Sequence, residues 1–306
     1  MGLDWTVSDI KDLTGKVIIV TGANSGLGYE ATKIYAEHGA TVIMACRSIE
    51  RAQTAKDKIM IAHKGSNLDL MELNLGSLKS INEFVTSFKK RYKKIDILMN
   101  NAGIMTVPYG LTEDGFELQN GVNHLGHFAL TAQLFDVIKK TPHSRIINIA
   151  SAAHKAGKMD FDNYLFEKGK YSKIKSYGRS KLSNLLFTYE LDRRIKAKGL
   201  DIKVLAAHPG SSSTGLARYL NSKRYERIAA SIFNKMSQSP YHGTLPQVRA
   251  SLDEEALGGQ YYGPSGIMEM KGKPVLVKSN KRSHNLEDAK KLWDISEELT
   301  KIKFEV

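Results

Sequence analysis

Three tyrosines in the sequence stand four residues before a lysine, a spacing that can produce a proton donor. The pairs are Tyr171 with Lys175, Tyr177 with Lys181, and Tyr219 with Lys223. On a helix, residues i and i+4 lie one above the other, so the ammonium group would lie beside the phenol. A free tyrosine titrates near pH 10, so its pKa must fall by roughly two to three units for proton exchange near neutral pH, and a close ammonium group favours the phenolate. Such a pair could exchange a proton with a substrate oxygen near neutral pH.

The surrounding sequence favours Tyr177 as the reactive tyrosine. It opens an amphipathic helical pattern in which Ser176 is a candidate N-cap. The apolar positions of this pattern recur at i, i+3, i+4 and i+7, namely Leu182, Leu185, Leu186 and Tyr189. Tyr171 lies in a stretch typical of a loop, and no strand-end serine precedes Tyr219 at a suitable distance. We therefore predict that Tyr177 and Lys181 carry the chemistry and that Tyr171 and Tyr219 lie on the surface.

Two polar residues could complete an acid–base group with this pair. Ser151 ends the expected strand "RIINIAS", at the carboxyl edge of an expected sheet, where such sheets bind ligands. Asn123 is a polar residue within an otherwise apolar helical pattern. Alone, each is more commonly a cap or a satisfied core amide. Together with Tyr177 and Lys181 they form an acid–base constellation.

A glycine-rich turn predicts a binding site for a dinucleotide. In "VIIVTGANSGLGYEATKIYAEHGA" a strand ends near Val20, Gly22, Gly26 and Gly28 follow, and a helix begins. Glycines let the backbone turn sharply and approach a pyrophosphate, and the helix N-terminus faces its negative charge. The spacing is G-x-x-x-G-x-G, and a glycine-rich turn without a ligand is the alternative.

The end of the second expected strand bears on the choice between NADP and NAD. An NAD enzyme usually places an acidic residue there to bind the ribose 2′-hydroxyl. In "MACRSIER" there is no such acid, and Arg47 stands near its place. A guanidinium suits a 2′-phosphate, which it binds as a fork. We therefore expect NADP, with NAD as the alternative if Arg47 only points into solvent.

The elements that must hold these residues alternate along the chain. Short apolar runs occur at 16–20, 40–45, 69–73, 95–100, 145–150, 201–208 and 273–277. They are continuous and often β-branched, as strands covered on both faces should be, and helical patterns lie between them. This order predicts an α/β fold: a Rossmann-type, doubly wound parallel sheet of about seven strands with helices on both faces. No linker divides the chain, so we expect one domain over 1–306.

Composition limits the class of protein. The chain has 306 residues, of which 42% are hydrophobic, and a formal charge of +13. The basic residues are scattered and do not interleave with aromatics, so nucleic acid is not an expected partner. Cys46 is the one cysteine and ends an apolar run, which favours core packing in a reducing compartment. Without an apolar segment long enough for a membrane span or a signal peptide, we expect a cytoplasmic location.

Six motifs occur in order and together resemble the short-chain dehydrogenase/reductase family. They are "TGANSGLG", "NNAG" (100–103), "NHLGHF" (123–128), "NIAS" (148–151), "YGRSK" (177–181) and "HPG" (208–210). The strings "NHLGHFALT", "SKLSNLLFTYEL" and "AKKLWDISEEL" are similar to the branch of retinol dehydrogenases and protochlorophyllide reductases. The resemblance covers about residues 13 to 300.

The resemblance implies a role for each matching residue. Tyr177 would be the general acid/base, Lys181 would lower its pKa and bind the nicotinamide ribose, Ser151 would bind the substrate carbonyl, and Asn123 would support a water relay to Lys181. The phosphate loop would consist of Gly22, Asn24, Ser25, Gly26, Leu27 and Gly28. The ribose side would be lined by Asn101, Ala102 and Gly103. The nicotinamide carboxamide would be held by Pro209, Gly210 and Thr214.

Two positions depart from the family pattern. The family usually has an aspartate after the third strand, near the adenine amino group, and here Asn74 takes its place. Its amide oxygen can still accept that hydrogen bond. The motif after Pro209 usually reads Gly-x-hydrophobic-x-Thr, whereas Ser212 stands at the hydrophobic position.

The predicted function is the NADP(H)-dependent interconversion of a hydrophobic aldehyde or ketone and its alcohol. An apolar stripe within about 211–240 suggests a substrate lid, with a core helix as an equal alternative and contact with a membrane surface as a poor third. His124 and His127 lack a third ligand, so no metal is expected. A non-catalytic dinucleotide-binding sensor or scaffold is the competing hypothesis. The sequence leaves the substrate's identity and a homo-oligomer open.

Overall fold

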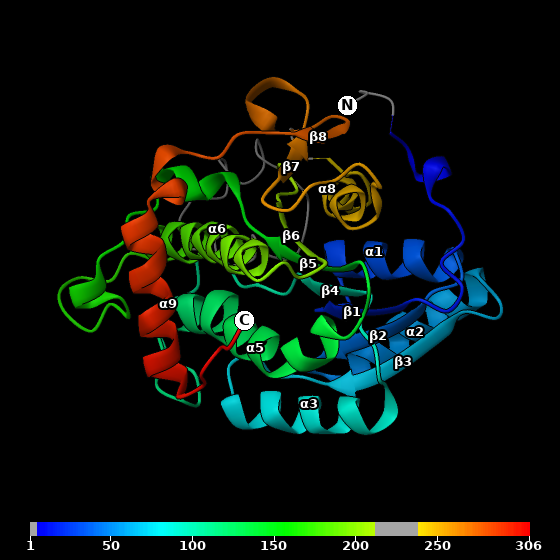
Figure 1. Ribbon diagram of the computed structural model, residues 1–306, viewed down its shortest axis with the longest axis horizontal. Helices are drawn as coiled ribbons and strands as arrows, with labels where there is room; N and C mark the ends of the chain where they lie inside the picture. The colour runs from blue at the N-terminus through cyan, green and yellow to red at the C-terminus, as the bar shows by residue number, and fades with distance from the viewer. Residues whose placement is uncertain (1–4, 212–237) are drawn as a thin grey trace, which may run out of the picture.

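The computed structural model describes residues 5–211 and 238–306, which form one central sheet with helices on both faces (Figure 1). Within these residues the sheet has eight strands in the order β3-β2-β1-β4-β5-β6-β7-β8. All neighbouring strands pair in parallel except β7 and β8, which are antiparallel. The strands are β1 (Val17–Thr21), β2 (Thr41–Cys46), β3 (Asn67–Glu72), β4 (Ile97–Asn100), β5 (Ser144–Ile149), β6 (Ile202–Ala207), β7 (Tyr261–Pro264) and β8 (Pro274–Leu276).

The central strands form because their side chains are buried on both sides of the sheet. Every residue of β1 and β4 is buried, and β5 and β6 are buried except at their second positions. Fully burying one isoleucine such as Ile19 stabilises the fold by about 1.5–3 kcal/mol. A continuous apolar run therefore specifies a central strand here, and the predicted doubly wound α/β fold is confirmed.

Two groups of helices cover the faces of the sheet (Figure 1). The first group shares one apolar core and consists of α1 (Gly26–Glu37), α2 (Ile49–Ala62) and α8 (Pro240–Leu252). The second group packs on the opposite face and consists of α3 (Leu78–Arg91), α5 (Gly126–Lys139) and α6 (Lys173–Ala197). The C-terminal α9 (Leu286–Thr300) lies outside α6, and its Trp293 stacks on Phe304 over the aromatic side chains of α5 and α6.

Short helical segments connect these elements at both edges of the sheet. Near the candidate site, α4 (Leu118–Asn120) continues directly into the π-helical segment η2 (Gly121–Leu125) and then into α5. The 3₁₀ segments are η1 (Val7–Asp9), η3 (Ala152–Ala156), η4 (Phe161–Asn163), η6 (Ile267–Glu269) and η7 (Lys281–His284). A π-helical turn inside a helix often marks a functional site, and this one contains Asn123.

Helix α6 starts earlier than the sequence predicts. Its N-cap is Ser172, whose side chain accepts a hydrogen bond from the backbone N–H of Lys175. Ser176, the predicted cap, is buried inside the helix. Tyr177 and Lys181 are therefore helical residues with a full turn before them, so the i, i+4 spacing fixes their geometry.

At the edge of the sheet, one of the two last strands was predicted and the other was not. The run 273–277 corresponds to β8, but β7 was not predicted, because its four residues "YYGP" include a glycine and a proline. The predicted lid at about 211–240 falls almost entirely outside the described residues, and so do Thr214, Ser212 and Tyr219. Within the described ranges, no helix is long and apolar enough to cross a membrane.

Candidate active site

The carboxyl edge of the sheet brings Ser151, Tyr177 and Lys181 together. Ser151 lies two residues after the end of β5, and the other two residues lie one turn apart on α6, which packs against that strand. The Tyr177 phenol is hydrogen-bonded to Ser151. The Lys181 Nζ atom lies 5.8 Å from the centre of the Tyr177 ring. Two hydroxyl groups and an ammonium group thus converge where a substrate oxygen could be bound and protonated.

The ammonium group of Lys181 is held inside the protein. Lys181 is 4% exposed, and its Nζ donates a 2.9 Å hydrogen bond to the carbonyl oxygen of Ile149 in β5. Burial lowers the pKa of Lys181 to about 8, because the charged form loses its hydration. The side chain is therefore mostly charged at pH 7, and the hydrogen bond to Ile149 holds the ammonium group near Tyr177.

The structure places the pKa of Tyr177 above its ordinary value, where the sequence had predicted a lowered one. Burial is the larger effect, since Tyr177 is 9% exposed, and the hydrogen bond from Ser151 offsets only part of it. The Lys181 ammonium donates its hydrogen bond to the Ile149 carbonyl and lies 5.8 Å from the centre of the Tyr177 ring. Tyr177 is therefore a neutral phenol at neutral pH in this structure.

The side chain of Asn123 is hydrogen-bonded to the loop after β4 and to α6. Its side-chain oxygen accepts from the backbone N–H of Ile104 (2.8 Å), and its amide nitrogen donates to the Ile104 carbonyl (3.0 Å) and to Ser180 (3.0 Å). Ser180 in turn donates to the carbonyl oxygen of Tyr177 (2.8 Å). Asn123 therefore joins the π-helical segment to α6 beside the tyrosine.

The glycine-rich turn forms a cradle that admits no further side-chain atoms. Gly22 and Gly26 have φ of 69° and 54°, which only glycine adopts without strain. A Cβ at Gly28 would overlap the Gly22 carbonyl oxygen. Ser25 is the N-cap of α1 and makes no side-chain cap bond, and Asn24 and Leu27 complete the turn. Exposed backbone at a helix N-terminus suits a pyrophosphate, so these residues fit a dinucleotide.

Cys46 is hydrogen-bonded to the backbone of this turn. It is buried at the end of β2, and its sulfur accepts backbone hydrogen bonds from Ala23 and Asn24. Burial raises the pKa of the thiol to about 11, so it stays neutral. The prediction that Cys46 is a packing residue is confirmed by its position.

A second loop, 101–103, lies between the glycine turn and Lys181. The Thr21 hydroxyl accepts the backbone N–H groups of Asn101 and Ala102, both at 2.9 Å. It also contacts His127 Nε2 at 2.9 Å. A Cβ at Gly103 would lie 3.2 Å from the Asn123 oxygen and 3.5 Å from Lys181 Nζ. The loop therefore lies next to both side chains, and a side chain at position 103 would be tight only against Asn123.

His124 and His127 have structural partners. His127 Nδ1 lies 3.0 Å from the Asn123 carbonyl oxygen, so this nitrogen carries the proton, and the Thr21 hydroxyl donates to Nε2. His124 pairs with Ser296 of α9 at 2.9 Å. Burial lowers the pKa of His124 to about 3 and that of His127 to about 4, so both are neutral. Among the described residues, no group of three potential ligands could hold a metal ion.

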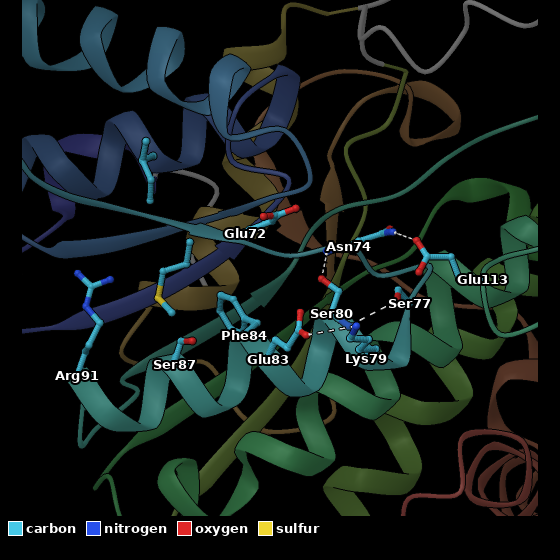
Figure 2. A pocket seen from close by; sticks show the side chains of 12 residues that line it. Glu72, Asn74, Ser77, Lys79, Ser80, Glu83, Phe84, Ser87, Arg91 and Glu113 are labelled. Atoms are coloured by element: carbon cyan, nitrogen blue, oxygen red, sulfur yellow. Dashed lines mark hydrogen bonds and ion pairs between the residues drawn. The ribbon is translucent and has the colours of Figure 1, made fainter.

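Arg47 and Asn74 lie beyond the ends of β2 and β3. Arg47 is exposed. Asn74 donates to Glu113 (2.8 Å), and its oxygen accepts from the backbone N–H of Gly76 (3.0 Å), leaving one lone pair of that oxygen for a further donor. Asn74 and Glu113 line a groove of about 550 Å³ along α3. Figure 2 shows them at one end of the groove and Arg91 at the other. The groove follows the β3 edge, away from Ser151.

The predicted nicotinamide loop follows β6. Gly210 has a φ of 62°, and a Cβ there would overlap the carbonyl oxygen of Met270. The Pro209 carbonyl accepts a 2.8 Å hydrogen bond from Gln238. His208 Nε2 lies 3.0 Å from a carboxylate oxygen of Glu269, whose pKa is lowered mainly by this contact. The loop is thus braced by the segment between β7 and β8.

Tyr171, which the sequence placed on the surface, is partly buried in the structure. Its hydroxyl donates to Glu117 at 2.9 Å and accepts from Gln119 at 2.8 Å. Burial, followed by the Glu117 carboxylate, raises the pKa of Tyr171. It is a neutral structural donor with no lysine partner. Glu117 itself was missed, because nothing in the string "DGFELQN" indicates that this acidic residue is buried.

The lowered pKa of Lys181 predicts a pH-dependent stability. Between about pH 8 and 10.5 the unfolded chain retains a proton at Lys181 that the folded protein has released. The free energy of unfolding of the wild type, relative to Lys181→Met, should therefore rise with pH in this window, by about 2 kcal/mol from pH 7 to 10. Urea unfolding of both proteins at the two pH values measures it. A difference that stays constant or falls would contradict the buried, desolvated ammonium.

Known proteins of similar sequence belong to one family of dehydrogenases. The profile of the short chain dehydrogenase family matches residues 16–225. Retinol dehydrogenase 13 of Homo sapiens is 37% identical over 286 residues, which cover 92% of this chain and 83% of that protein. Retinol dehydrogenase 11 of Homo sapiens is 37% identical over 286 residues, with 93% and 85% covered.

Solved structures share the fold. A protein from Mycobacterium paratuberculosis is 34% identical with a TM-score of 0.81, and 99% of each chain is covered. A short chain dehydrogenase from Escherichia coli complexed with NADPH is 20% identical with a TM-score of 0.64, with 82% of this chain and 97% of that one covered. The chain therefore belongs to the short-chain dehydrogenase family, in its retinol dehydrogenase branch, and is an oxidoreductase that acts on CH–OH or carbonyl groups with a nicotinamide dinucleotide.

Proposed function

We propose that this oxidoreductase interconverts a hydrophobic aldehyde or ketone and its alcohol with NADP(H), and that Tyr177 is the general acid/base. The observation that carries the proposal is the Tyr177–Ser151 hydrogen bond at the carboxyl edge of the sheet, with the buried Lys181 ammonium one turn away. These groups meet at the edge where the 101–103 loop and the glycine turn also lie.

The residues of the chain act on the substrate oxygen. NADPH would supply a hydride to the carbonyl carbon. As negative charge grows on the oxygen, the neutral Tyr177 phenol donates its proton and Ser151 donates a hydrogen bond. The raised pKa of Tyr177 keeps that proton available at neutral pH, which suits carbonyl reduction. Alcohol oxidation would need the phenolate, which the Lys181 charge would stabilise.

The dinucleotide would extend along the edge of the sheet. The turn of Gly22, Gly26 and Gly28 would hold the pyrophosphate, and Asn101 to Gly103 would line the ribose next to Lys181. Pro209 and Gly210 would adjoin the nicotinamide. Arg47, exposed after β2 with no acidic residue at the strand end, would bind the 2′-phosphate of NADP.

The substrate is proposed to be apolar. The named relatives are retinol dehydrogenases, and retinol is a long apolar alcohol with one polar end. We therefore propose an aldehyde or ketone that offers only its carbonyl oxygen to Ser151 and Tyr177. All-trans-retinal, decanal and a steroid ketone sample this class.

A cofactor oxidation assay tests this function. NADPH and NADH are each mixed with the three carbonyl compounds, and the loss of absorbance by the reduced cofactor is followed. We expect turnover of at least one compound, faster with NADPH. NADPH binding without turnover of any compound would support the non-catalytic sensor and overturn the proposal.

Replacing Arg47 tests the choice of cofactor. In Arg47→Ser the KM for NADPH should rise by about tenfold or more, because one charged hydrogen-bonded contact to a phosphate is lost, while the KM for NADH stays unchanged. Stability should not change, since the side chain is exposed. Arg51→Ser, four residues further along and also exposed, serves as the control. Equal effects on the two cofactors would refute the role of Arg47.

A further inference from the structure

Glu117 is a buried carboxylate at the centre of a hydrogen-bond network. It is 0% exposed and is the N-cap of α4. It accepts five hydrogen bonds, from the backbone N–H of Gln119 (3.0 Å), the backbone N–H and side chain of Asn120 (2.9 and 2.6 Å), Ser176 (2.8 Å) and Tyr171 (2.9 Å). Among the described residues it is balanced by these donors rather than by an ion pair. Hydrogen bonds to a charged acceptor are about twice as strong as neutral ones.

This network joins the two segments that carry the candidate site. Ser176 directly precedes Tyr177 on α6, and Asn120 lies three residues before Asn123. Asn120 also donates to Ser176 at 3.3 Å. One turn further along both segments, Asn123 donates to Ser180. The π-helical segment and α6 are therefore joined on both sides of Tyr177.

Tyr171 extends the network to the loop before α4. Its hydroxyl lies 3.3 Å from the Val107 carbonyl oxygen, and its ring packs edge-on against Tyr109. Gln119 accepts the backbone N–H of Thr106 at 2.7 Å and donates to the Lys173 carbonyl at 2.9 Å. Glu117 thus fixes the entry to α6, the loop 104–109 and the π-helical segment relative to one another.

We propose that Glu117 is a positioning residue, which sets the place of Tyr177 against Ser151 by holding Ser176 and Asn120 through its carboxylate. The inference rests on the proposed function. Glu117 does not touch the reacting groups, so its loss should act on the rate of the chemical step rather than on cofactor binding. A displacement of about 1 Å at a reacting group can cost about 10²-fold in rate.

The test compares Glu117→Gln with wild type. Glutamine keeps the shape of the side chain but places an NH₂ group among five donors, so at least one hydrogen bond is replaced by a repulsion. With NADPH and the fastest of all-trans-retinal, decanal and a steroid ketone, we expect kcat to fall about tenfold or more. The Kd for NADPH should stay within about twofold, and the pH at half-maximal rate should shift.

Two further variants separate positioning from general stability. Ser176→Ala removes one donor and is expected to fold; its kcat should fall severalfold, and it should have no added effect in Glu117→Gln. Thr141→Val is the matched control, because Thr141 is buried at the opposite end of the sheet and bridges Ile95 and Val137. It should lower the melting temperature without changing kcat or the pH profile.

The outcomes distinguish this inference from the proposed function. Loss of turnover in Tyr177→Phe with an unchanged kcat in both Glu117→Gln and Ser176→Ala would overturn the positioning role alone. A kcat loss in Thr141→Val equal to that of Ser176→Ala at the same loss of stability would also overturn it. Absence of turnover by wild type would refute the proposed function.

Discussion

Tyr177→Phe is expected to lower kcat for carbonyl reduction by about 10²- to 10⁴-fold, the usual contribution of a positioned general acid. Phenylalanine fills the same buried space, so the packing of α6 is kept. The variant loses the hydrogen bond with Ser151 and the proton that would neutralise the substrate oxygen. Lys181 keeps its bond to the Ile149 carbonyl, so NADPH binding should change little. Steady-state kinetics and a binding titration with NADPH measure both parts.

Tyr189→Phe is the matched control for this prediction. Tyr189 lies on the same helix, is also buried, and its hydroxyl is hydrogen-bonded to Ser279 at 2.8 Å. Its loss should cost stability of about 1 kcal/mol and leave kcat unchanged. If Tyr189→Phe and Tyr177→Phe lowered kcat equally, the effect would be one of stability, and the assignment of the acid to Tyr177 would fail.

Gly28→Ala is expected to weaken NADPH binding by about 10²-fold or more, through a loss of at least 2.7 kcal/mol. The added Cβ would overlap the Gly22 carbonyl oxygen and the Asn101 side chain, both of which belong to the cradle. Backbone atoms there cannot yield without moving the turn, and overpacking of this kind also lowers stability by about 1–3 kcal/mol. The Kd for NADPH and the free energy of unfolding are measured together.

Gly65→Ala separates the two effects. Gly65 has a φ of 88° in the turn after α2, and a Cβ there meets no atom within 4 Å. Alanine at that position costs about 1–2 kcal/mol of backbone strain. This control should lose stability but bind NADPH normally. Normal binding by Gly28→Ala as well would show that the glycine turn does not hold the cofactor.

Much of the fold could be predicted because burial on both faces leaves a simple pattern. The runs that became β1, β2, β4, β5 and β6 are mostly apolar, and short runs of this kind are typical of strands that are covered on both faces. Strand β7 could not be found, since "YYGP" lacks the length and the β-branched residues of a strand. It forms because β6 offers it a partner edge, which is a tertiary effect.

The start of α6 shows the limit of local reasoning. Ser172 and Ser176 are both serines before a helical pattern, and either could be a cap. The hydroxyl of Ser176 is instead bound by the Glu117 carboxylate, 59 residues away in the sequence. That contact exists only after folding, so the cap could not be assigned from the sequence.

The sequence predicted that Ser151, Tyr177 and Lys181 lie together, as they do in the structure, but it did not predict the pKa of Tyr177. The spacing of Tyr177 and Lys181 places them one turn apart on a helix, as expected. The direction of the pKa of Tyr177 depends on how deeply it is buried and on where the Lys181 ammonium points, and the sequence contains neither quantity. Glu117 and Tyr171 were missed for the same reason, because a buried polar network has no local signature.

The most direct test of the account is the single-turnover rate of NADPH oxidation as a function of pH, in wild type and in Tyr177→Phe. For wild type, the rate of carbonyl reduction should be constant at low pH and should fall about tenfold per pH unit above a single apparent pKa, as the phenol loses its proton. The slow residual rate of Tyr177→Phe should lack that transition. The account would be contradicted by a variant that keeps the wild-type rate, or by the same pH transition in both proteins.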